Sequence, residues 1–592
     1  MTRRILLLLL IFVINNGFAN SLKDHHSPYL AMHGNDPIQW MEWSDTLLQR
    51  AQKENKLLFI SVGYYACHWC HVMHRESFSN KAIAKLLNEH YIAVKVDREL
   101  NPVLDKRLIE FVSATRGHAG WPLSVFITPQ GDPLIGLTYM PREQFSRILK
   151  GLTKEWDKDS KLLSKQAAEQ NKRLHLALQG KERQGDKAGV IDSTAKLIKQ
   201  VMENADTFSG GFGQQTKFPS TPQLHALMVL NKDKKDQSID SFIRLSLDSM
   251  ASKGLHDDLA GGFYRYTVDQ QWDTPHFEKM LYNNATLAIL YADAAKQYDH
   301  TPYRHVAIQT LHFMTTAMQG EQGAFIASLS AVDDKGVEGG YYLWDSATIK
   351  KQLSEQQYHL AQLAWKLDTS TGKKPLKVEY QLSTLAKQLK LSEKEISQSL
   401  DQIRLILLKH QQTTRQLPRD DKLLTAWNAL TLAAFVTVND PQFNKNTQRL
   451  AEFLMTLWDG KQLYRSSAKR QKGTLQDYAS TAWSLLLWSK QSNNKQAAKV
   501  AQALLTKAWD DFYIKQQWHL VRQSALKQGV NASHLTDTAY PTAETLLLRA
   551  SFLSEDSIMI DKAKQVLHLS SQFLEENPYS YASLIELSNQ LK

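Results

Sequence analysis

Over residues 45–140, short apolar runs alternate with longer amphipathic runs. Three apolar runs predict buried strands at residues 57–63, 91–97 and 123–129. Three amphipathic runs predict helices at residues 45–56, 80–90 and 102–115. A tight turn around Gly131 leads into one further strand. Strands separated by helices are typical of an α/β layer structure.

The pattern becomes helical after about residue 190. Long amphipathic segments predict helices at residues 221–232, 285–298, 423–438 and 480–492, separated by loops rich in glycine and aromatic residues. Paired helices over a stretch of this length are typical of an α/α toroid. The intervening residues 146–190 are charged and helical in pattern, which predicts a helical linker. Residues 27–43 contain two prolines and predict an irregular lead-in.

The first 19 residues have the pattern of a signal peptide. Arg3 and Arg4 precede the apolar run 5–14, and Gly17-Phe18-Ala19 forms a small-x-small cleavage pattern. We therefore expect cleavage after Ala19 and export to the periplasm or the medium. Since no later stretch has the apolar length of a spanning helix, we expect no stable membrane insertion after cleavage.

The net charge of +11 raises the question of nucleic acid as a partner. Basic and acidic residues are interspersed, as in the segment 157–187, which is typical of solvated helix faces. Together with the export signal, this pattern predicts that the protein does not bind nucleic acid.

The two cysteines of the 592-residue chain, Cys67 and Cys70, lie in the segment CHWC. An apolar strand precedes them and a helix is predicted to follow, so Cys67 would face the unpaired N–H groups of a helix N-terminus, which stabilise a thiolate. Cys67 would attack and Cys70 would resolve. Protonated His68, next to Trp69, would favour the thiolate further. Pro122 precedes the third apolar strand, where a thioredoxin-like fold carries its cis-proline loop.

Three other interpretations of the cysteine pair stay open. The segment CHWCH satisfies the haem-attachment pattern, with His71 as axial ligand. Thiolates with His71 or His74 would suit zinc. A permanent disulfide staple across two residues would constrain little chain entropy. The strand and helix context favours the redox interpretation.

Several segments resemble the family of spermatogenesis-associated protein 20 and its bacterial relatives. They include FISVGYYACHWCHVMHRESF, GHAGWPLSVFITPQGDPL, LAGGFYRYTVDQQWDTPHFEKMLYNNA and PRDDKLLTAWNAL. The resemblance implies an α/β thioredoxin-like domain followed by an all-α (α/α)6 toroid similar to six-hairpin glycosidases and sugar 2-epimerases. It places the thioredoxin-like domain at residues 20–145 and the toroid at residues 191–592.

The predicted toroid loops carry acidic, basic and aromatic side chains of the kinds that bind and process sugars. The candidates are Asp258, Arg265, Asp269, His276, Glu278, Asp420, Asp421, Trp427 and Asp477. Structural roles compete with this interpretation: Thr274 and Pro275 have the pattern of a helix start, and Asp420 and Asp421 could cap the next helix. Ser330 and Val332 depart from the acidic pair expected in the family, which weakens any inherited sugar chemistry.

We therefore expect thiol–disulfide exchange through Cys67 and Cys70, with a protein thiol or disulfide as client and the toroid recognising the client or a carbohydrate. The alternatives are a carbohydrate-active enzyme with an accessory redox domain, and a non-enzymatic binding scaffold. The expected chemistry requires no cofactor and no metal at these sites.

Overall fold

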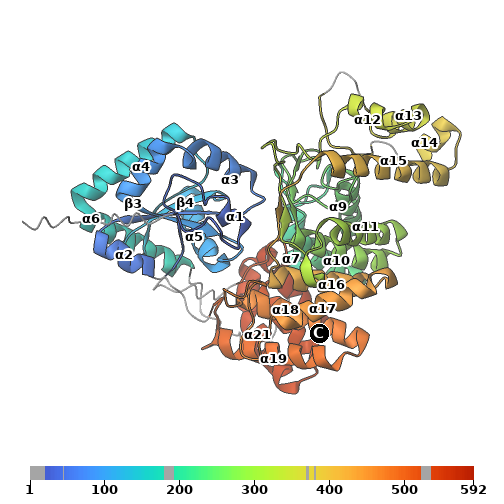
Figure 1. The fold of residues 1–592 in the computed structure, drawn as a ribbon. Helices are drawn as coiled ribbons and strands as arrows, with labels where there is room; N and C mark the ends of the chain where they lie inside the picture. Colours follow the sequence, from blue (N-terminus) through green and yellow to red (C-terminus); the bar gives the residue numbers. More distant parts are fainter. Residues whose placement is uncertain are drawn as a thin grey trace, which may run out of the picture.

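A five-stranded sheet forms the centre of the N-terminal part of the chain, drawn in blue in Figure 1. The computed structural model describes residues 20–44, 46–178, 193–367, 372–378, 382–521 and 535–591. The predicted signal peptide and residues 179–190 of the predicted linker lie outside the described residues. The strands are β1 (Met41–Glu42), β2 (Leu57–Gly63), β3 (Tyr91–Asp97), β4 (Leu123–Ile127) and β5 (Pro133–Leu137).

The strand order is β1-β3-β2-β4-β5. Strands β1, β3 and β2 are parallel, whereas β4 runs antiparallel to β2 and β5 antiparallel to β4. Every residue of β2 and β3 is buried. The strands can be apolar on both faces because helices cover both faces.

The helices of this domain divide between the two faces of the sheet. Leu58 and Ile60 of β2 pack with α2 (Thr46–Glu54) and α5 (Pro102–Arg116). The alternate residues Leu57 and Phe59 belong to the core that includes α4 (Lys81–His90) and α6 (Arg142–Leu178). The residues assigned from the sequence to strands and helices here form those elements.

Helix α6 packs on the sheet domain, although its residues from 146 onward were predicted to form a linker. Phe145 and Leu149 are fully buried, and the Trp156 indole donates a hydrogen bond to the Asn55 carbonyl at 2.8 Å. The helix is interrupted at Asp159, whose φ and ψ are −156° and 76°. We refer to residues 20–178 as the sheet domain.

The lead-in at residues 27–43 was predicted to be irregular but contains two short elements. They are α1 (Pro28–Ala31) and the edge strand β1. Ser27 caps α1 by accepting a hydrogen bond from the Leu30 N–H, a pattern that favours a helix start.

Twelve helices of residues 193–591 form two concentric rings, which confirms the predicted (α/α)6 toroid (Figure 1). The inner ring contains α8 (Thr221–Lys234), α10 (Leu281–Tyr298), α16 (Thr425–Val438), α18 (Leu475–Ser492), α20 (Ala543–Leu553) and α22 (Ala582–Gln590). Each inner helix contacts the next, and α22 returns to α8. The outer ring contains α7 (Thr194–Glu203), α9 (Gln237–Ser252), α11 (Thr301–Ala317), α17 (Asn444–Thr456), α19 (Lys495–Phe512) and α21 (Ser557–Glu576).

Loops and one helical insertion complete the toroid. The insertion has its own apolar core and contains α12 (Ser346–Gln352), α13 (Glu355–Ala364), α14 (Leu382–Leu389) and α15 (Glu393–Thr414). Short strands lie in the loops: β6 (Tyr266–Thr267), β7 (Pro275–His276), β8 (Lys279–Met280), β9 (Ser328–Leu329), β10 (Arg419–Asp420), β11 (Tyr513–Ile514) and β12 (Gln517–Trp518). Among the described residues, no helix has both the length and the apolar character needed to cross a bilayer.

Candidate functional site

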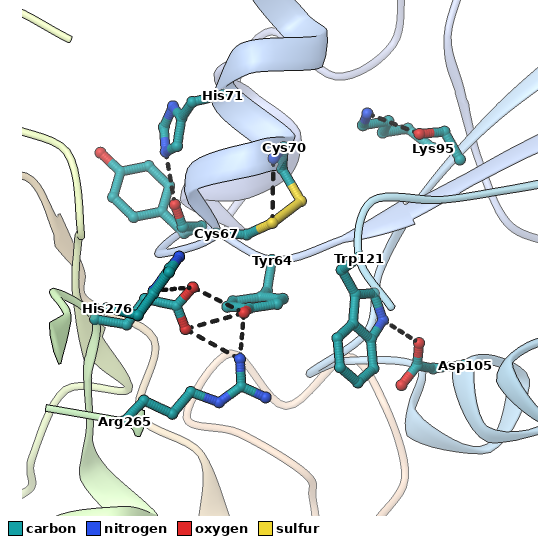
Figure 2. The surroundings of a disulfide bond; sticks show 12 residues. Tyr64, Cys67, Cys70, His71, Lys95, Asp105, Trp121, Arg265 and His276 are labelled. Atoms are coloured by element: carbon teal, nitrogen blue, oxygen red, sulfur yellow. Dashed lines mark hydrogen bonds and ion pairs between the residues drawn. A yellow bond between two sulfur atoms is a disulfide. The ribbon is translucent and has the colours of Figure 1, made fainter. Parts of the chain in front are cut away.

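The cysteine pair lies where strand β2 gives way to the short helix α3 (His68–Met73), as the sequence predicts. Cys67 is the N-cap of α3, and its Sγ accepts a hydrogen bond from the Cys70 N–H at 3.1 Å. The two sulfurs form a disulfide, with the Cα atoms 5.2 Å apart (Figure 2). A sulfur at this position faces the N–H groups that stabilise a thiolate once the disulfide is reduced.

The histidines after the pair have partners other than the sulfurs. His71 Nε2 lies 2.8 Å from the Tyr65 carbonyl, and burial lowers the pKa of His71 to about 4. His74 Nε2 lies 2.7 Å from an oxygen of Asp36. Since the sulfurs are bonded to each other, this arrangement differs from both the haem attachment and the zinc site considered from the sequence.

The loop before β4 places a large aromatic ring beside the cysteine segment. The Trp121–Pro122 peptide bond is cis, and Pro122 is buried. The Trp121 ring packs edge to face on Tyr64 at 5.9 Å, and its indole donates to Asp105 at 2.7 Å. Trp69, between the cysteines, is 46% exposed and packs against Tyr139 at 4.8 Å between ring centres.

The sheet domain and the toroid meet at Tyr64, three residues before Cys67. The Tyr64 hydroxyl lies 2.9 Å from both oxygens of Glu278 and accepts a hydrogen bond from Arg265. Arg265 also donates to Glu278 at 3.0 Å and to the Tyr282 hydroxyl at 3.1 Å. Two predicted toroid candidates, Arg265 and Glu278, therefore contact Tyr64, in the segment that leads to the cysteine pair. Figure 2 shows Arg265 on the side of Tyr64 away from the disulfide.

A carboxylate from the toroid lies between two histidines from the two domains. One oxygen of Glu338 is 3.5 Å from His68 Nε2, and the other is 3.5 Å from His276 Nε2. The His68 and His276 ring centres are 6.3 Å apart, and His276 stacks on Tyr266 at 4.7 Å. This cluster brings a third toroid candidate, His276, to the redox segment.

The protonated His68 expected from the sequence disagrees with its surroundings. Burial is the largest influence and lowers the pKa of His68, although Glu338 acts in the opposite direction. The imidazole is therefore mostly neutral at pH 7, and the helix N-terminus is left as the main stabilising influence on a Cys67 thiolate.

The disulfide is almost inaccessible to solvent. Cys67 is 3% exposed and Cys70 is 2% exposed. The Ala331 N–H of the toroid lies 3.4 Å from the Ala66 carbonyl, next to Cys67. The toroid therefore contacts the residue that precedes the cysteine pair.

A second contact between the domains buries three carboxylates around one lysine. Lys422 Nζ lies 2.8 Å from Asp97, 3.1 Å from Glu99 and 2.5 Å from Asp420. Burial is the main cause that raises the pKa of Glu99, to about 8. Asp420 therefore joins the domains rather than capping α16, which begins at Thr425.

Asp477 and Trp427 also lie near the contact between the domains. Asp477 accepts two hydrogen bonds from Arg465 at 2.9 Å, and Arg465 Nε donates to the Glu99 carbonyl at 2.7 Å. Trp427 packs against Tyr282 at 4.8 Å. Both candidates therefore make contacts within the part of the toroid that faces the sheet domain.

The remaining candidates lie apart from the cysteine pair. Asp258 accepts hydrogen bonds from Trp365 at 2.7 Å and Arg404 at 2.9 Å, which hold the helical insertion. Asp269 accepts from the N–H groups of residues 273 and 274, and Asp421 is exposed. The helix start predicted at Thr274 and Pro275 is wrong, because this segment forms β7 and β8 and α10 begins only at Leu281.

A narrow cavity of about 40 Å³ lies between the inner helices of the toroid. Its lining comes from the inner helices and includes His225, Leu430, Trp483, Arg549 and Glu586. Small-molecule pockets typically enclose about 300–1,000 Å³, so this cavity is too small for a sugar ring.

Sequence reasoning missed the residues that bring the two domains together. The contacts of Tyr64 and Glu99 could not be predicted from neighbouring residues, because their partners, Glu278 and Lys422, lie more than two hundred residues away in the chain. The one usable signal was the position of Glu99 just beyond the carboxyl end of a buried parallel strand, where functional side chains gather.

Comparisons with known proteins agree with the resemblance noted from the sequence. A DsbH-type thioredoxin family model, described as a protein of unknown function (DUF255), matches residues 19–175 and confirms the thioredoxin-like domain. In structure, a cellobiose 2-epimerase from Bacillus thermoamylovorans is similar to the toroid, with a TM-score of 0.42 and 9% identity over 67% of this chain and 98% of that protein.

Two curated relatives match most of the chain. An uncharacterized protein of Caenorhabditis elegans is 30% identical over 623 residues, covering 95% of this chain and 84% of that protein. Spermatogenesis-associated protein 20 of Mus musculus is 32% identical over 459 residues, covering 70% of this chain, and the match spans 58% of the mouse protein's length. The chain therefore belongs to the family that includes this nematode protein and spermatogenesis-associated protein 20.

Proposed function

We propose that the protein carries out thiol–disulfide exchange through Cys67 and Cys70. The observation that carries the proposal is the disulfide at the first turn of α3, with Cys67 as the N-cap, directly after a buried central strand. This position lowers the pKa of a cysteine thiol and makes its sulfur a good nucleophile and a good leaving group.

The exchange follows two displacement steps. A client thiolate attacks Cys67 Sγ, forms a mixed disulfide and expels the Cys70 thiolate, which takes up a proton. A second client thiolate then attacks the client sulfur of the mixed disulfide and releases Cys67, so the client is oxidised and the pair is reduced. The reverse sequence reduces a client disulfide and restores the Cys67–Cys70 bond.

The toroid controls access in this proposal. Its residues Arg265, Glu278 and Ala331 contact the cysteine segment, and the sulfurs are almost fully buried. We infer that clients react while this contact is open, and that the toroid mouth selects the client. Glu278, Asp420 and Asp477 are engaged by Arg265, Lys422 and Arg465, which disfavours the carbohydrate-active alternative because a glycosidase needs carboxylates that reach its substrate.

We also propose that residues 1–19 direct export, so that the clients are exported proteins. Fusion of these residues to a reporter enzyme and fractionation of the cells test this point. Retention of the reporter in the cytoplasm would contradict it.

The test of exchange uses the full chain with a scrambled disulfide protein and with reduced insulin. We expect activity that Cys67→Ser abolishes, whereas Cys70→Ser traps a mixed disulfide that resolves in dithiothreitol. The reduction potential against glutathione then assigns the direction: about −120 mV indicates an oxidant and about −270 mV a reductant. Equal activity of wild type and Cys67→Ser would overturn the proposal.

A further inference from the structure

Three side chains behind the cysteine helix converge on one point. His33 Nδ1 lies 2.8 Å from one oxygen of Asp36, and His74 Nε2 lies 2.7 Å from the other oxygen. Among the described residues they are the one group of histidine, cysteine and acidic side chains whose ligand atoms all lie within 4.8 Å of one another. We propose that His33, Asp36 and His74 bind a divalent transition-metal ion of the zinc type.

The donor set suits such an ion. Two imidazole nitrogens and a carboxylate are ligands that zinc prefers, and a site with three protein ligands leaves a further position for water. Calcium and magnesium prefer oxygen donors alone, so the two histidines argue against them. Both sulfurs are committed to their disulfide, so this site is separate from the cysteine pair.

The surroundings of the cluster resemble those of a metal site. The Trp40 indole donates a hydrogen bond to Asp36 at 2.8 Å, which orients the carboxylate as outer partners of metal ligands do. His33 is fully buried, with its Nδ1 2.8 Å from Asp36. The His74 side chain is 23% exposed, which gives an ion a path to the cluster.

The position of the cluster means that a bound ion would link two segments of the sheet domain. His33 and Asp36 belong to the segment between α1 and β1, whereas His74 is the C-cap of α3. A bound ion would therefore join the segment before the sheet to the far end of the helix that begins at Cys67. We expect metal binding to stabilise the sheet domain by mass action.

The alternative is a cluster held only by hydrogen bonds, in which Asp36 accepts N–H groups from His33, His74 and Trp40. The two arrangements differ in the tautomer of the imidazoles. In the hydrogen-bonded cluster the nitrogens that face Asp36 carry the ring protons, whereas with a metal they offer lone pairs and each proton lies on the other ring nitrogen. Nitrogen-15 NMR of the histidine rings distinguishes the two tautomers.

The experiment uses the full chain with Cys67→Ser and Cys70→Ser, so that no thiolate competes. After treatment with a chelator, the protein is titrated with zinc chloride and, separately, with cobalt(II) chloride. We expect one zinc per chain, and cobalt absorption bands typical of nitrogen and oxygen ligands. His74→Ala and Asp36→Asn should each weaken zinc binding by at least roughly tenfold.

The matched control is His90→Ala, which removes an exposed histidine at the end of α4 and should bind zinc as the parent does. Circular dichroism without metal establishes that each variant is folded, and His74 is the safest ligand to replace because it is the least buried. No zinc bound to the cysteine-free chain, or equal affinity in the parent and His74→Ala, would overturn the proposal.

Discussion

The Tyr64 hydroxyl of the sheet domain donates a hydrogen bond to Glu278 of the toroid at 2.9 Å, three residues before Cys67. Because Arg265 engages the same hydroxyl and the same carboxylate, the contact joins a cation, an anion and a phenol within a buried region. The position of the toroid over the disulfide is therefore tied to the residues that lead into α3.

Replacing Tyr64 by phenylalanine should weaken this contact. The change removes the hydroxyl and leaves Glu278 one buried hydrogen bond short, at a cost of about 1–3 kcal/mol. The open state should then be more populated by roughly 5–150-fold, since 1.4 kcal/mol corresponds to a factor of ten. We expect iodoacetamide to alkylate reduced Cys67 faster by a factor in this range.

Tyr139→Phe is the matched control, because it removes an exposed hydroxyl that bonds Glu76 outside the contact between the domains. Its alkylation rate should equal that of the wild type. An unchanged rate in Tyr64→Phe would show that this hydrogen bond does not hold the toroid over the sulfurs.

The raised pKa of Glu99 should make the free energy of unfolding fall as the pH rises. Its pKa is raised from 4.5 to about 8, so the folded state binds more protons than the unfolded state between these values. Stability is therefore lost from about pH 4.5 upward, until both states are ionised above pH 8. Glu99→Gln should flatten this dependence and gain a few kcal/mol at pH 9 relative to wild type. Denaturant unfolding at pH 5 and pH 9 measures the effect, with exposed Glu89→Gln as the unchanged reference.

The lowered pKa of Lys95 should make the free energy of unfolding rise as the pH rises. Its ammonium group is buried against the rings of Phe78, Trp40 and Tyr29, with Ser61 as hydrogen-bond partner at 3.0 Å. Burial lowers the pKa of Lys95 from 10.5 to about 7, so the unfolded state binds more protons between pH 7 and pH 10.5 and stability rises with pH across this window.

Lys95→Met should therefore stabilise the protein by a few kcal/mol at pH 6, and the gain should shrink toward pH 10.5. Melting temperatures at pH 6, 8 and 10 are the measurement. Exposed Lys85→Met should show no such trend, and a loss of stability in Lys95→Met at pH 6 would contradict the prediction.

Glu586→Gln should destabilise the toroid. Glu586 accepts hydrogen bonds from His225 at 2.8 Å and from Arg549 at 2.9 Å beside the cavity between the inner helices. Although burial acts in the opposite direction, the carboxylates of Glu586 and Asp293 raise the pKa of His225 to about 10.

This pair contributes stability that is complete below pH 6.5 and is lost as the pH rises through about 10. We expect Glu586→Gln to cost about 3–5 kcal/mol at neutral pH, because it removes the buried carboxylate that His225 and Arg549 share. The difference from wild type should narrow toward pH 10. Glu555→Gln breaks only an exposed pair with Lys490 and should cost less than about 1 kcal/mol.

The sequence predicted those parts of the fold that depend on local periodicity. The fully apolar run 57–63 became the central strand β2, and the segment 423–438, apolar on all sides, became the inner helix α16. The redox position of Cys67 followed from the same pattern, because strand, cysteine pair and helix are contiguous in the chain.

Contacts between distant segments could not be predicted in this way. Pro275 and His276 have the composition of a helix start, but they pair with Tyr266 and Thr267 as a strand. Here tertiary packing outweighs local propensity. Asp420 likewise lies in the cluster of Lys422 and Glu99 and does not cap the nearest helix. A buried carboxylate needs a cation as partner, wherever in the chain that cation comes from.

The enclosure of Cys67 and Cys70 also affects how fast the oxidation state of the pair responds to thiols in solution. A disulfide that dissolved thiols cannot reach reacts with them slowly, even when the equilibrium of thiol–disulfide exchange favours the reaction. We infer that the pair reacts with the ambient redox buffer only while the two domains are apart, so that its oxidation state depends on the last partner that separated them.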